Sequence, residues 1–178
     1  KMHENIDLII PRGSNAFVKY VQEHTKIPVL GHSEGICHIY VDKNADLNKA
    51  IGISFDAKCQ YPAVCNAVET LIVNKDIAKK FLPRMIKKLK EANVEIRGDE
   101  PTREIVDVKK ATEQDWDTEY NDLILSVKVV NDLDEAISHI NKHSSKHTDS
   151  IITENKKNAE KFMNLVDSAS VMWNASTR

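Results

Sequence analysis

The segment YPAVCNAVETLIV contains the residue best suited to covalent chemistry, Cys65. Its thiol lies in a short irregular stretch just before an apolar run that predicts a strand, so the backbone presents it, as a nucleophile requires. Because a free thiol is mostly protonated near neutral pH, such a site has to favour the thiolate. The backbone amides of Cys65 and Asn66 are candidate donors to an oxyanion. The alternative is a small apolar residue packed where the strand begins.

The other two cysteines have structural interpretations. Cys37 lies among isoleucines in a predicted strand, which favours core packing, and Cys59 ends an amphipathic helix. Three cysteines without a CxxC pair argue against a disulfide framework and against a zinc site built on thiolates, and they indicate a reducing environment. A disulfide between Cys59 and Cys65 is conceivable, but it would silence the nucleophile.

Three histidines, His139, His143 and His147, are spaced by four residues. On one helix this spacing would align the imidazoles for a metal ion. The helix is expected to end near His143, before two serines, and no carboxylate completes the set. We therefore predict no metal site here.

A phosphate-binding turn is suggested by Arg12, Gly13 and Ser14, which lie between a predicted strand and the start of a predicted helix. Backbone amides and the helix dipole favour an anion at such a position. An ordinary strand-to-helix turn with a capping serine fits equally well. Gly31 and Gly35 would let the backbone approach a ligand closely, or would simply form a turn.

These candidates are positioned by alternating strands and helices. Apolar runs predict strands at residues 6–11, 27–32, 36–42, 69–73, 94–98, 122–130, 149–154 and 168–174. Amphipathic patterns predict helices at residues 15–24, 47–59, 76–92, 132–143 and 155–166, with Pro83 expected to kink or split the third. Residues 99–122 are polar and are left without an assignment. The alternation predicts an α/β fold with largely parallel sheets.

Composition places the chain among ordinary globular proteins. It has 178 residues, 41% of them hydrophobic and 29% charged, with a formal net charge of −2. Without a clustered basic face we expect no nucleic-acid binding, and no apolar run approaches the ~18 residues of a membrane span. The length suits one or two small domains. Both ends look cut, because the chain opens almost directly on a strand and stops just after one.

Five motifs, in this order, are more specific than any of these patterns: IDLIIPRGS, PVLGHSEGICHIYVD, YPAVCNAVETLIV, HTDSIITE and SVMWNASTR. Together they resemble the γ-glutamyl phosphate reductases (glutamate-5-semialdehyde dehydrogenases) of the aldehyde dehydrogenase superfamily. The nearest likeness is to the reductase half of eukaryotic Δ1-pyrroline-5-carboxylate synthase, which is fused to glutamate 5-kinase. The resemblance covers essentially the whole chain and weakens only across residues 99–122.

The resemblance implies an aldehyde dehydrogenase fold and a cysteine nucleophile, which carries over to Cys65. It implies that Gly13 and Ser14 meet the dinucleotide NADPH, and that residues 1–51 end the cofactor domain while 52–178 form most of the catalytic domain. The implied reaction, in proline biosynthesis, reduces γ-glutamyl phosphate to glutamate 5-semialdehyde through a Cys65 thioester, with release of phosphate.

One departure from hydrolytic aldehyde dehydrogenases supports this reaction. Those enzymes carry a glutamate that activates water just before their L-G-G turn, and the resemblance places Val29 at that position. His32 and Glu34 are nearby polar groups, and His32 is a candidate substrate contact. Arg12 and Arg178 are the cations available for an anionic cofactor and substrate.

Two other interpretations remain open. A CoA-acylating aldehyde dehydrogenase would use the same thioester with a different acyl acceptor, and a regulatory or assembly module would keep the fold without the chemistry. The resemblance leaves open a fused or associated kinase and a homo-oligomeric full-length protein. The compartment would be mitochondrial for the fused enzyme and cytoplasmic for the monofunctional one.

We predict that the 178-residue chain alone neither binds NADPH well nor turns over, because the family's first nucleotide-binding half, its upstream oxyanion asparagine and its glycine-rich substrate segment are not in this sequence. Incubating the chain with glutamate semialdehyde, NADP and phosphate should give no increase in absorbance at the wavelength of NADPH. Phosphate-dependent NADP reduction would contradict the prediction.

Overall fold

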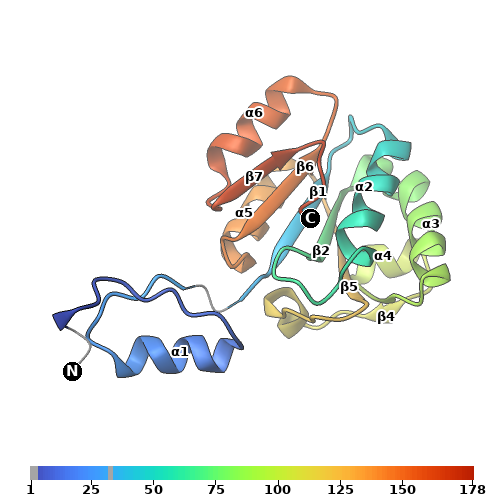
Figure 1. The fold of residues 1–178 in the computed structure, drawn as a ribbon. Helices are drawn as coiled ribbons and strands as arrows, with labels where there is room; N and C mark the ends of the chain where they lie inside the picture. Colours follow the sequence, from blue (N-terminus) through green and yellow to red (C-terminus); the bar gives the residue numbers. More distant parts are fainter. Residues whose placement is uncertain (1–3, 32–33) are drawn as a thin grey trace. The chain divides into compact units, whose positions relative to one another are not determined.

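The apolar runs of the second part of the chain form one parallel sheet in a computed structural model, which describes residues 4–31 and 34–178. Every neighbouring pair of strands is parallel, and the order across the sheet is β4-β3-β5-β2-β1-β6-β7 (Figure 1). The strands are β1 (Cys37–Val41), β2 (Val68–Asn74), β3 (Glu95–Gly98), β4 (Lys109–Lys110), β5 (Ile124–Val130), β6 (Thr148–Ile152) and β7 (Ser170–Trp173). The central strands β1 and β2 are buried along their whole length, as parallel strands covered on both faces should be.

Helices connect the strands and begin at side-chain caps. They are α2 (Leu47–Cys59), α3 (Lys75–Glu91), α4 (Glu100–Ile105), α5 (Leu133–His143) and α6 (Lys156–Leu165). Side chains of Asp46, Asn74, Asp99, Asp132 and Asn155 accept hydrogen bonds from the first-turn amides. The split that was one expected effect of Pro83 does not occur, since α3 is continuous through this residue. Among the described residues, none of these helices is long and apolar enough to cross a membrane.

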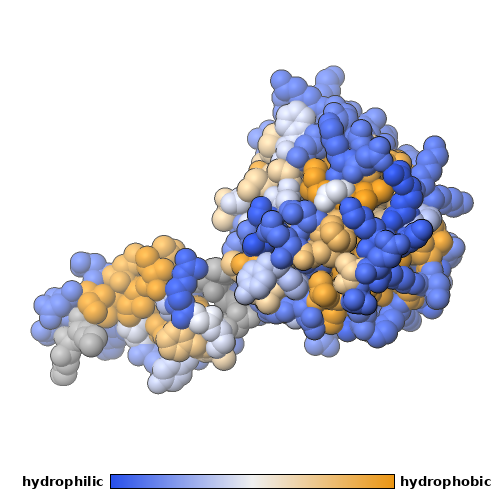
Figure 2. Space-filling model, turned by 45° about the vertical axis from the view of Figure 1, so that its right-hand side comes forward, coloured by the Kyte–Doolittle hydropathy of each residue, from blue (hydrophilic) through white to orange (hydrophobic). Residues whose placement is uncertain are grey.

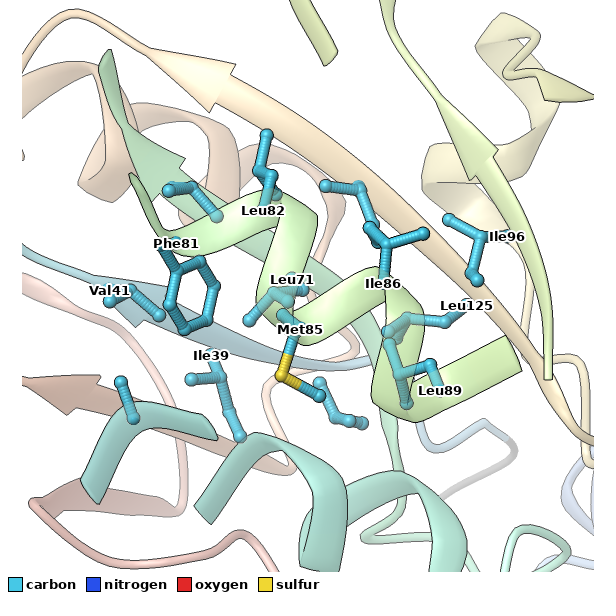
Figure 3. Packing of buried hydrophobic residues seen from close by; sticks show 14 of the residues in the cluster. Ile39, Val41, Leu71, Phe81, Leu82, Met85, Ile86, Leu89, Ile96 and Leu125 are labelled. Atoms are coloured by element: carbon cyan, nitrogen blue, oxygen red, sulfur yellow. The ribbon is translucent and has the colours of Figure 1, made fainter. Parts of the chain in front are cut away.

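The two faces of the sheet carry separate hydrophobic cores. On one face α3 packs Phe81, Met85 and Leu89 against strand residues that include Leu71 and Leu125 (Figure 3). On the other face α5 and α6 cover a second cluster around Tyr40, Ile72, Ile140, Ile151 and Phe162. Helices α2, α3 and α4 thus lie on one side and α5 and α6 on the other (Figure 1).

Residues 99–122, which the sequence left unassigned, form α4, the edge strand β4 and a 3₁₀ helix (Glu113–Asp117). This segment is held by a polar network around Asp115 and not by a stripe of apolar side chains. The Asp115 carboxylate accepts hydrogen bonds from Arg97 Nη1 at 2.6 Å, Tyr120 Oη at 2.7 Å and the Thr112 amide at 2.6 Å. Such a network leaves no periodic hydrophobic signal, which is why the sequence pattern did not predict it.

Residues 1–34 form a separate compact unit from residues 35–178. In the first unit, α1 (Asn15–His24) begins at Ser14, whose hydroxyl accepts from the Phe17 amide at 3.4 Å. The strands expected at residues 6–11 and 27–32 are reduced to one parallel bridge between Ile9 and Val29. This unit leaves large apolar side chains exposed, and orange atoms lie on its surface in Figure 2. The exposed large side chains are Ile6, Leu8, Ile10, Phe17, Tyr20 and Leu30.

The boundary between the compact units therefore differs from the predicted domain boundary. The structure divides the chain between Glu34 and Gly35, whereas residues 51 and 52 lie inside α2. The physical reason is that β1 and α2 belong to the large sheet and its core, with Ile39, Val41, Ala50 and Ala57 in one cluster.

We predict an acid-labile contribution to stability from Asp115. Burial alone would raise its pKa, but the hydrogen bonds from Thr112, Arg97 and Tyr120 outweigh burial and lower it to about 2. Because the folded pKa is the lower one, the unfolded chain binds the proton first. Stability is therefore full above about pH 4 and is lost towards pH 2, by roughly 2 kcal/mol at ~1.4 kcal/mol per pKa unit.

Urea unfolding followed by circular dichroism between pH 2 and 6 would measure this loss. Asp115→Asn should flatten that part of the curve, whereas Asp134→Asn, at an exposed carboxylate paired with Lys161, should not. Identical acid slopes in Asp115→Asn and the unchanged protein would disprove the assignment.

Candidate active site

Cys65 lies in the turn that joins α2 to β2, with its side chain half-buried. The turn is closed by a hydrogen bond from the Ala67 amide to the Val64 carbonyl at 2.9 Å. All three cysteines are free thiols, so the conceivable bond between Cys59 and Cys65 is not formed. Cys37 is fully buried, as its place among isoleucines predicted, and burial raises its pKa, with Asp149 adding to the effect.

A buried ion pair joins the two stems of this turn. Lys58 at the end of α2 donates through Nζ to Glu69 Oε2 of β2 at 2.6 Å, and the two side chains are 0% and 1% exposed. Burial raises the pKa of Glu69 to about 7, with Lys58 opposing the shift, and burial lowers the pKa of Lys58 against the attraction of Glu69. Each charge is therefore tolerated in the core because the other compensates it.

A second set of contacts, made by Arg178, connects the two ends of the same turn nearer to solvent. Arg178 donates through Nη1 to Asn66 Oδ1 and through Nε to Gln60 Oε1, the latter at 3.1 Å. Its guanidinium carbon lies 6.0 Å from the ring centroid of Tyr61. These contacts bring a permanent positive charge to the residue that follows Cys65. They also fix the side-chain oxygen of Asn66, so the side-chain nitrogen, Nδ2, stays available as a donor.

Arg178 reaches this turn because the chain reverses after β7. Asn174 adopts a left-handed backbone with φ 51°, and its amide donates to the Ile151 carbonyl at 2.9 Å. The Ser150 hydroxyl then holds the Ala175 carbonyl at 2.7 Å. The last residues consequently fold back towards the end of α2 and the start of β2, where Arg178 contacts Gln60 and Asn66 (Figure 1).

The predicted cofactor residues come together within the first unit. Gly13 and Ser14 form the exposed start of α1, and Arg12 precedes them. Gly31 packs against Pro11 so closely that a Cβ would lie 3.0 Å from the Pro11 Cγ, and its carbonyl accepts from Gln22 at 3.3 Å. His32, the predicted substrate contact, lies outside the described residues.

The histidine series does not line up as a metal site. His139 and His143 are neighbours on α5, with ring centroids 4.5 Å apart, whereas His147 lies beyond the helix and contacts the Thr148 hydroxyl at 2.8 Å. Burial, followed by the neighbouring charges of His38 and His143, lowers the pKa of His139 to about 2. Within the part of the chain that the structure describes, no group of histidine, cysteine or carboxylate side chains could hold a metal ion.

Sequence reasoning missed four residues on the turn and its two stems: Lys58, Gln60, Tyr61 and Glu69. A lysine in an amphipathic helix is normally solvated, so nothing in the pattern marked Lys58 as buried. A signal was available for Glu69, because it interrupts an apolar strand that is buried throughout. A charge in such a strand requires a partner.

A model of the aldehyde dehydrogenase family matches residues 1–111. The chain belongs to the aldehyde dehydrogenase family. It is 60% identical over 183 residues to a γ-glutamyl phosphate reductase of Methanococcoides burtonii, and 60% identical over 179 residues to one of Trichodesmium erythraeum. The two alignments span 99% and 100% of this chain, but only 41% and 42% of the length of the relatives. The chain thus spans about two fifths of the length of the curated relatives it matches.

Solved structures agree on the fold. The γ-glutamyl phosphate reductase of Thermotoga maritima superimposes with a TM-score of 0.98 at 50% identity, covering 100% of this chain and 43% of that one. An NADP complex of glyceraldehyde-3-phosphate dehydrogenase from Methanocaldococcus jannaschii gives 0.77 at 19% identity, covering 98% and 47%, which shows the fold alone. The prediction of an α/β aldehyde dehydrogenase fold, present as a fragment of its relatives' length, is therefore confirmed.

We predict that Lys58→Met destabilises the fold by about 3–5 kcal/mol, because it leaves the Glu69 carboxylate buried without its partner. Combining it with Glu69→Leu should recover most of the loss, since neither charge then remains in the core. The matched control is Lys49→Met, which breaks an exposed lysine–glutamate pair with Glu154 at 2.9 Å and should cost less than about 1 kcal/mol.

Chemical denaturation of the four proteins at pH 7 gives the comparison directly. Similar losses for Lys58→Met and Lys49→Met would show that the buried pair has no special part in the turn.

Proposed function

We propose that the protein containing this chain reduces γ-glutamyl phosphate to glutamate 5-semialdehyde with NADPH, in proline biosynthesis. The observation that carries the proposal is the position of Cys65, a half-buried thiol on a turn whose stems are joined by Lys58–Glu69 and whose surface is tied by Arg178. An alignment with a γ-glutamyl phosphate reductase at 60% overall identity covers the whole chain, this turn included.

The chemistry proceeds through the sulfur of Cys65. The thiolate attacks the γ-acyl carbon, the carbon–oxygen bond to phosphate breaks, and phosphate leaves with that electron pair. The resulting thioester is reduced by hydride to a hemithioacetal, which expels the thiolate and releases the aldehyde. Covalent capture divides one difficult displacement into two easier steps.

Two neighbours of Cys65 support these steps. The backbone amides of Cys65 and Asn66 are the donors for the developing oxyanion, and the side-chain nitrogen of Asn66, left available by the contact between Arg178 and Asn66 Oδ1, adds a third donor. The Arg178 guanidinium attracts the anionic substrate to the turn. Since its orientation is already set by Gln60 and Asn66, little ordering is needed when substrate binds.

NADPH supplies the hydride when bound. The residues present fit an anionic cofactor, because Arg12, Gly13 and Ser14 lie exposed at the amino end of the ten-residue helix α1, and Gly31 adds a closely packed backbone beside Pro11. We assign residues 1–34 to the cofactor domain and residues 35–178 to the catalytic domain, which moves the predicted boundary to the division between the compact units.

We predict that Cys65→Ser in the complete protein lowers the rate of semialdehyde formation by at least about 1,000-fold, because a serine hydroxyl is far less ionised than a thiol. Steady-state oxidation of NADPH with enzymatically generated γ-glutamyl phosphate measures the loss. The matched control is Cys59→Ser, at a half-buried free thiol that ends α2. It should retain the wild-type rate.

Reverse turnover tests the acyl acceptor. Oxidation of glutamate semialdehyde should require phosphate or arsenate, and a requirement for CoA instead would favour a CoA-acylating enzyme. If the Cys65→Ser protein keeps its rate, the nucleophile is wrong. Equal alkylation of Cys59 and Cys65, the two half-buried thiols, read by mass spectrometry, would favour an assembly module without chemistry.

A further inference from the structure

Gly35, the first residue of the second unit, lies against the backbone of Cys65. A Cβ added at Gly35 would lie 2.0 Å from the Cys65 carbonyl oxygen and 2.7 Å from both the carbonyl carbon and Cα of Cys65. Such distances do not occur between non-bonded atoms, and backbone cannot swing aside as a flexible side chain can. The absence of a side chain at Gly35 is therefore a condition for the observed position of Cys65.

The chain around Gly35 is itself anchored on its other side. The Ile36 amide donates to the Ser145 hydroxyl at 2.8 Å, and the Ile36 carbonyl accepts from the Ser145 amide at 3.3 Å. Two residues later the His38 amide donates to Asp149 Oδ1 at 2.7 Å. Because these contacts hold residues 36–38 to the start of β6 and the loop before it, crowding at Gly35 would be relieved by displacement of the Cys65 turn.

Cys37 contacts the same carbonyl group. Its Sγ donates to the Cys65 carbonyl oxygen at 3.4 Å, an ordinary distance for a hydrogen bond from sulfur. The thiol is fully buried, and burial raises its pKa, so that it keeps the proton needed to donate. Gly35 and Cys37 thus touch one atom of the nucleophile's backbone, the first by leaving room for it and the second by bonding to it.

We propose that Gly35 and Cys37 are positioning residues that fix the backbone of Cys65, and so set where its sulfur meets an acyl group. The proposal deepens the proposed function, on which its kinetic arm rests. It assigns a role to the glycine that the sequence suggested for close approach to a ligand. The group that approaches Gly35 is the nucleophile's own backbone.

The test compares Gly35→Ala with two glycine controls in the complete protein. At Gly98 an added Cβ would lie 2.7 Å from Thr102 Cγ2, so Gly98→Ala imposes a steric cost away from the Cys65 turn. At Gly52 an added Cβ would meet nothing within 4 Å. We expect Gly35→Ala to lower kcat about 100-fold with KM changed less than about threefold, as a displacement on the order of 1 Å can do.

Alkylation of Cys65 by iodoacetamide, followed across pH 6–10 by peptide mass spectrometry, gives a readout independent of the reaction. Gly35→Ala should change the rate constant for alkylation of Cys65 at least about fivefold relative to Gly98→Ala. Each variant is measured the same number of degrees below its own melting temperature. A rate constant and kcat within twofold of the Gly98→Ala protein would overturn the proposal. The Cys65→Ser variant tests the proposed function separately. If Cys65→Ser keeps its kcat, the proposed function fails; if Cys65→Ser loses its kcat and Gly35→Ala does not, only the positioning role fails.

Variants at Cys37 keep the proposal testable if Gly35→Ala does not fold. Cys37→Ala removes the donor with little change in volume and should lower kcat about fivefold, the equivalent of one ordinary hydrogen bond. Cys37→Ser restores a donor and should recover at least half of that loss. Equal kcat values in Cys37→Ala and Cys37→Ser, with both near wild type, would refute the role of this hydrogen bond.

Discussion

The buried contact between Lys58 and Glu69 is the interaction on which the geometry around Cys65, the proposed nucleophile, depends. It joins the end of α2 to the start of β2, so the chain between them has to form a turn of fixed span, and Cys65 lies on that turn. Two charges without solvent are costly, and the attraction between them offsets part of that cost. The outer contacts of Arg178 with Gln60 and Asn66 repeat the same connection where water is present. The turn is thereby fixed from inside and outside.

This turn lies at the amino ends of the parallel strands, whereas open α/β sheets generally bind ligands beyond the carboxyl ends. Because the turn lies at the amino ends of the strands, segments that are distant in the sequence have to reach it. The chain before β1 supplies Gly35 and Cys37, and the chain after β7 has to fold back over the sheet to supply Arg178. Segments far apart in sequence converge on one short turn, so the position of the thiol depends on the whole parallel sheet.

The sequence predicted the regular part of this architecture because burial on a sheet face leaves a periodic pattern. The helices capped by Asp46 and Asp132 and the strands around Leu71 and Leu125 were found in this way. It failed where polar contacts replace periodicity, as around Asp115, and where an apolar run such as residues 6–11 pairs only at Ile9. The placements of Cys65 and Arg178 were suggested by motifs, but no pattern revealed that Lys58 is buried.

Arg178 shows how one side chain serves both the fold and the proposed chemistry. A guanidinium has five N–H donors in a rigid plane, and here two of its nitrogens are used by Asn66 and Gln60. The remaining donors keep their direction because the used ones fix the plane. A lysine could supply the charge but not this geometry, since its ammonium group rotates freely on a flexible stem. The arginine therefore presents an oriented positive charge at Asn66, the residue next to the proposed nucleophile, before any anion arrives, which is the condition for electrostatic preorganisation.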